Sequence, residues 1–78
     1  MVNITFKFVN IYGVKFVTWL IINDDDNPFE WNNYNIVCPP HASNSGMFNF
    51  DGDYNQLQQS LLNNNNDNLI INVQRFDK

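Results

Sequence analysis

The sequence predicts a small α+β fold: an antiparallel sheet of about four strands, led by an N-terminal β-hairpin, with one helix packed on one face. Three observations predict this class. Two segments with alternating apolar residues fill the first 22 residues, one segment with a helical period follows residue 53, and a further alternating segment begins at residue 69. The expected order is β-β-(β)-(β)-α-β, in one domain over residues 1–78.

The first two segments are expected to form the hairpin. Apolar side chains alternate with polar ones in the first segment, at Val2, Ile4, Phe6 and Phe8. The second segment continues the period at Val14, Phe16, Thr18, Leu20 and Ile22. Residues 11–13, Ile-Tyr-Gly, fit a three-residue loop with glycine in the left-handed conformation. This loop pairs Phe8 with Phe16 and Ile4 with Leu20, so that the two apolar faces coincide.

The predicted register leaves three apolar residues of the second strand on the opposite face. These are Val17, Trp19 and Ile21. Either the second strand is covered on both faces, with the middle segment around Trp31 and Tyr34 as the cover, or it presents an apolar patch to a partner.

The middle of the chain carries weaker signals. Residues 23–28, Asn-Asp-Asp-Asp-Asn-Pro, end the second strand. Residues 29–33 indicate irregular chain, 34–38 a short strand, and 41–46 a loop. Met47, Phe48 and Phe50 are expected in another brief strand.

One helix and one last strand complete the predicted fold. Asp53 is a good N-cap, and Gln56 lies three residues later, as in a capping box. Apolar residues then recur at the helical period, at Tyr54, Leu57, Leu61 and Leu62. The asparagine run at 63–66 is expected to end the helix. Leu69, Ile71 and Val73 alternate as the last strand.

The two ends of the chain resemble ubiquitin-like folds, and the Phox-and-Bem type of interaction domain in particular. The resemblance lies in a hairpin carrying a basic residue, Lys7, and in Asp51-Gly52-Asp53 followed by a helix and a final strand. Those folds have a helix directly after the hairpin, whereas residues 23–46 show no helical period. The chain is therefore not assigned to that family.

Composition favours a protein partner over nucleic acid. Eight acidic residues against four basic ones give a formal net charge of −4. Phosphate contacts need clustered Lys and Arg, which the chain does not have. Asparagine occurs 16 times and lysine three times. This ratio fits either a lineage that tolerates asparagine tracts or selection against positive charge, and the second case would suit a partner with a basic surface.

The remaining sequence features indicate an intracellular protein without a membrane segment. No apolar run approaches the roughly 20 residues of a membrane helix. The N-terminus does not have the pattern of a secretory signal, and one cysteine, Cys38, excludes an internal disulfide. A cytoplasmic location is expected, in the host cytoplasm if the protein is viral.

No motif predicts catalysis, a metal or a cofactor. Cys38 and His41 are too few ligands for zinc, and no orienting group accompanies them as a nucleophile and base. Asp51-Gly52-Asp53 matches the start of a calcium loop, but Gln56 and Leu62 stand where glycine and a bidentate acid are required. A turn leading into a helix N-cap explains the same residues. We therefore expect a protein that is not an enzyme.

The leading hypothesis is a small acidic protein-binding module. Its expected contact residues are apolar anchors and an acidic loop, namely Val17, Trp19, Ile21, Asp24, Asp25, Asp26, Phe29, Glu30 and Trp31. A specific form of this hypothesis is a phage or viral inhibitor of a host nucleic-acid-binding protein. The alternative is a structural or self-associating subunit, a homodimer through the hairpin face or through the edge strand near residues 69–76.

Overall fold

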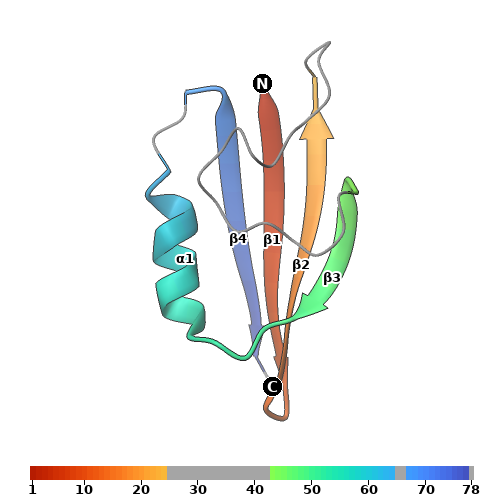
Figure 1. Cartoon of the computed structure of the whole chain (residues 1–78), viewed down its shortest axis with the longest axis vertical. Coiled ribbons are helices and arrows are strands. Elements are labelled where there is room, and N and C mark those ends of the chain that lie inside the picture. Colours follow the sequence, from red (N-terminus) through yellow and green to blue (C-terminus); the bar gives the residue numbers. More distant parts are fainter. Residues whose placement is uncertain (25–42, 65–66, 78) are drawn as a thin grey trace.

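A computed structural model describes residues 1–24, 43–64 and 67–77 (Figure 1). This part of the chain forms four strands and one helix: β1 (Val2–Ile11), β2 (Val14–Asn23), β3 (Ser45–Asn49), α1 (Tyr54–Leu62) and β4 (Leu69–Asp77). The short strand predicted at 34–38 lies outside the described residues. The predicted α+β class and the order of the elements are confirmed.

The strands form one sheet in the order β3-β2-β1-β4. β1 pairs antiparallel with β2, and β2 with β3, but β4 pairs parallel with β1. The sheet is therefore mixed, and the prediction of an antiparallel sheet holds only for the first three strands. The parallel pair arises because α1 carries the chain from the end of β3 back to the end of the sheet where β3 began (Figure 1).

The hairpin register differs by one residue from the predicted one. Ile11 pairs with Val14, so the loop contains two residues, Tyr12 and Gly13. Both have positive φ, 51° and 84°. A two-residue loop with two positive φ angles is a type I′ turn, whose twist matches that of the flanking strands. The predicted three-residue loop is wrong.

A shift of one residue exchanges the two faces of β2. Phe6 lies opposite Trp19 and Phe8 opposite Val17, instead of opposite Thr18 and Phe16. The pattern of β2 could not decide between the two registers, because both of its faces carry apolar residues. The turn decides, and it directs Trp19 into the core.

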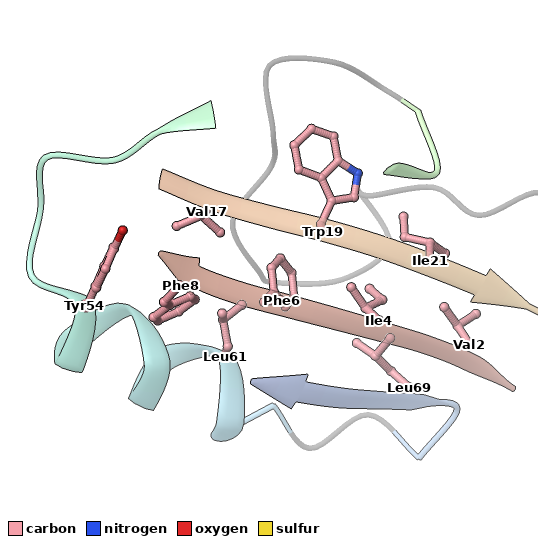
Figure 2. Close-up of a cluster of buried hydrophobic side chains, with 10 residues drawn as sticks. All are labelled: Val2, Ile4, Phe6, Phe8, Val17, Trp19, Ile21, Tyr54, Leu61 and Leu69. Carbon is pink, nitrogen blue, oxygen red and sulfur yellow. The ribbon is translucent and has the colours of Figure 1, made fainter. Parts of the chain in front are cut away.

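The core lies on one face of the sheet, between the strands and α1 (Figure 2). Its buried members are Val2, Ile4, Phe6, Phe8, Val17, Trp19, Ile21, Tyr54, Leu61 and Leu69. The half-buried side chains of Phe48, Phe50, Leu57, Ile71 and Val73 pack against this group. The alternation predicted for β1 and for β4 is therefore confirmed.

Trp19 is held by β3 and by the chain just before it. Its indole Nε1 donates a hydrogen bond to the Ser43 carbonyl oxygen at 3.0 Å, and its ring lies 5.9 Å from that of Phe48. Gly46 is the register partner of Trp19. A Cβ atom at residue 46 would overlap the indole ring, so the absence of a side chain there makes room for Trp19.

The helix begins and ends as the sequence predicts. The Asp53 carboxylate accepts a hydrogen bond from the Asn55 N–H at 2.9 Å, which makes Asp53 the N-cap. Tyr54 and Leu61 are the buried residues of α1, and the chain leaves the helix at Asn63. Residues 50–53 link β3 to α1. The Tyr54 ring at the start of α1 packs against Phe8 of the hairpin.

Candidate protein-binding surface

The face of the sheet opposite the core carries exposed apolar side chains. We call it the open face, because α1, the one helix in the described part of the chain, packs on the other side. Its exposed apolar residues come from all four strands and are Ile11, Val14, Leu20, Ile22, Met47, Ile70 and Phe76. An apolar sheet face exposed to water is costly, and such patches mark interaction sites in many proteins.

The strand register places most of these residues at the two ends of the open face, and Met47 lies between the ends, opposite Thr18. Phe16, Val9 and Phe76 lie side by side on β2, β1 and β4. Ile22 and Ile70 flank Asn3 at the opposite end, where the Asn72 Nδ2 donates to the Asn3 Oδ1 at 2.7 Å. Two apolar groups are therefore separated by a polar middle.

Lys7 lies in that polar middle. Its register neighbours are Thr18 on β2 and Gln74 on β4. Among the described strand residues that alternate onto this face, Lys7 is the one charged side chain, and it is exposed. A partner that covers the open face must therefore supply an acceptor, such as a carboxylate, near Lys7.

Three of the predicted contact residues lie in the core instead. Val17, Trp19 and Ile21 are buried, because the two-residue turn directs their side chains to the core face. Their alternate neighbours Leu20 and Ile22 occupy the open face. β2 is apolar on both sides, as predicted, but the side expected to meet a partner is the buried one. The glycine at residue 13 suits a loop of two residues as well as one of three, and the two-residue loop is the one that places Leu20 and Ile22 on the open face.

The acidic loop is described at one position. Asp24 is exposed, and its N–H donates to the Met1 carbonyl oxygen at 3.2 Å. The other predicted contact residues lie outside the described residues: Asp25, Asp26, Phe29, Glu30 and Trp31. The same is true of Cys38 and His41. The described part of the chain contains no group of three or more His, Cys, Asp or Glu residues placed to hold a metal.

A second cluster of polar groups surrounds Tyr54 on the core side. The Tyr54 hydroxyl lies 2.7 Å from the carbonyl oxygens of both Val9 and Phe16 and shares its one proton between them, and so connects α1 to both strands of the hairpin. The Lys15 ammonium lies 5.3 Å and the Arg75 guanidinium 5.7 Å from the centre of its ring. Burial raises the pKa of Tyr54, and the hydrogen bond to Phe16 offsets part of that shift.

A cleft of about 610 Å³ lies between α1 and β4. The helix and its C-cap residue contribute four amide side chains and one apolar side chain, and β4 contributes one arginine. The lining residues are Asn55, Gln58, Gln59, Leu62, Asn63 and Arg75. The Arg75 Nη1 donates to the Asn55 Oδ1 at 2.7 Å, and its Nη2 lies 3.8 Å from the Asp77 carboxylate. The cleft offers hydrogen-bonding groups but, among its lining residues, no acid or nucleophile for catalysis.

Comparison with protein-family models, with curated proteins and with solved structures finds no match for this chain. Within the described residues, no helix is both long enough and apolar enough to cross a membrane.

Proposed function

We propose that this protein is a non-enzymatic protein-binding module that docks a partner on the open face of its sheet. The observation that supports this proposal most directly is the set of large apolar side chains exposed on that face, of which Leu20 and Ile22 lie toward the end of β2. Aromatic and aliphatic anchors that lose their water contacts supply most of the energy of small interfaces. The open face has such anchors at both ends and a polar middle that fixes orientation.

The charge of the chain bears on the choice of partner. The net charge of −4 favours a partner with a basic surface, and the exposed Asp24 follows the apolar end of β2. In the specific form of this proposal, the protein is a phage or viral inhibitor that acts in the host cytoplasm on a nucleic-acid-binding protein. The proposal of a phage or viral inhibitor rests on the small size of the chain and on its negative net charge.

Affinity capture with matched variants tests the proposal. The bait is the full chain, exposed to a lysate of the organism or host and washed at low and high salt. Leu20→Ser and Ile22→Ser together are expected to abolish capture of a stoichiometric partner. Tyr12→Ser is the control, because Tyr12 is a large side chain, 86% exposed, that lies in the turn and does not line the cleft. A partner retained by the double variant would contradict docking on the open face.

Self-association through the same face is the alternative, and mass in solution distinguishes it. A dimer by light scattering that dissociates in Leu20→Asp would show that a second copy occupies the open face. Trp19→Asp is unsuitable for this test, since it would place a charge in the core and report on folding. A monomeric wild type would exclude self-association.

A further inference from the structure

The outer edge of β4 presents a row of backbone groups that β1 does not use. The Asn68 carbonyl oxygen accepts from the Val2 N–H at 2.9 Å, so residue 68 directs its backbone groups toward β1. In a strand this direction alternates from residue to residue. The N–H and C=O groups that point away from the sheet therefore belong to Leu69, Ile71, Val73, Arg75 and Asp77.

Within the described residues, no strand pairs with these outward groups. β4 is the last strand of the sheet on its side, and its backbone hydrogen bonds in the described structure run to β1. The strand has nine residues and contains neither proline nor lysine, two residues that commonly protect an edge, and its charged residues, Arg75 and Asp77, lie near its end. A long regular edge of this kind is a template for one more strand.

The cleft between α1 and β4 lies beside this edge. Arg75 connects the two features, because its side chain lines the cleft and its backbone belongs to the outward row. The hydrogen bond from Arg75 to Asn55 connects β4 to α1, which lines the other side of the cleft. The volume of about 610 Å³ is within the range of ligand-binding clefts, roughly 300–1,000 Å³. A segment that pairs with β4 would therefore have its side chains beside the amides of α1.

We propose that the groove between α1 and β4 binds an extended peptide segment of another protein, which adds to the sheet as a fifth strand next to β4. Peptide side chains on the α1 side meet Asn55, Gln59 and Arg75, which favours acidic or amide side chains there. A second copy of this chain fits less well, because antiparallel pairing of two β4 strands places both α1 helices on the same face beside the junction. This site is separate from the open face and does not depend on it.

Selection from a random peptide library tests the proposal directly. The bait is the full chain, and the probe is a library of 12-residue random-sequence peptides displayed on phage. The most enriched peptide is then synthesised and added to the labelled protein. Amide hydrogen exchange is expected to slow at Ile71, Val73 and Arg75, whose N–H groups point outward. The amides of β2 are expected to stay unchanged.

Two variants separate this site from the open face. Val73→Pro removes an outward N–H without breaking a bond to β1 and is expected to weaken peptide binding about tenfold while circular dichroism shows the variant folded. Val73 also packs against the core, so Val73→Ala, which keeps the N–H and loses the packing, is the matched control and is expected to bind the peptide as the wild type does. Leu20→Ser is expected to bind the peptide as the wild type does. The proposal is overturned if no peptide is enriched, or if the enriched peptides slow exchange on the open face instead. It is also overturned if the β4 amides become protected at high protein concentration without peptide, which would assign the edge to a second copy.

Discussion

Tyr54 is the residue that joins the helix to the hairpin. Its hydroxyl contacts the carbonyl oxygens of Val9 and Phe16, and its ring packs 4.9 Å from that of Phe8. The helical period places Tyr54 on the buried face, but the hydrogen bonds depend on where the strands lie. Tyrosine suits this position because its apolar ring packs in the core while its hydroxyl bonds to the backbone of the hairpin.

Removal of the Tyr54 hydroxyl tests this connection. Tyr54→Phe keeps the ring and loses the hydrogen bonds, so the free energy of unfolding should fall by about 1 kcal/mol in a urea titration. Tyr12→Phe is the control, because Tyr12 is 86% exposed in the turn and should leave stability unchanged. If the two substitutions leave the free energy of unfolding equally unchanged, the hydroxyl of Tyr54 contributes nothing to stability.

The raised pKa of Tyr54 predicts a loss of stability in alkali. Burial favours the neutral phenol in the folded state, so the folded pKa lies above the unfolded value of 10.0. The resulting stabilisation is complete below that unfolded value and disappears as the pH rises through the folded pKa. The stability difference between wild type and Tyr54→Phe should therefore shrink above pH 10.0. A constant difference across this range would show that Tyr54 does not titrate differently in the folded chain.

At the scale of elements, the turn between β1 and β2 decides which residues are buried. Tyr12 adopts a positive φ of 51°, which is unfavourable for most residues and which asparagine tolerates better. Tyr12→Asn should therefore raise the free energy of unfolding by roughly 0.5–1 kcal/mol in thermal or urea unfolding. Gly13→Ala should lower it, since φ is 84° there. If Tyr12→Asn destabilises the protein, the turn is not of type I′.

The stability of the whole molecule depends on one small core. Two phenylalanines on neighbouring strands show the contrast between the core face and the open face of the sheet. Phe6 is fully buried, whereas Phe76 on the open face is 50% exposed. Phe6→Ala should cost about 3–5 kcal/mol, a large part of the 5–15 kcal/mol of a typical domain. Phe76→Ala should cost less than about 1 kcal/mol. Urea unfolding followed by circular dichroism measures both, and similar losses would mean that the open face is covered in solution.

Much of the fold could be predicted from local patterns. The alternation in β1, the N-cap at Asp53 and the helical period after it are properties of short segments, and each element formed where it was expected. The candidate surface was less predictable. Val17 and Trp19 were expected to face a partner, and they are buried because of a difference of one residue in the turn.

Local patterns were enough to predict the α+β class, the order of the elements and the apolar character of both faces of β2. They did not show which face of β2 enters the core, because a slip of one residue exchanges the two faces at almost no cost in local pattern. They also did not show that β4 pairs parallel with β1 beside α1, as the border strand of the described sheet. Strand order and direction depend on long-range contacts, and no short segment of the sequence records them.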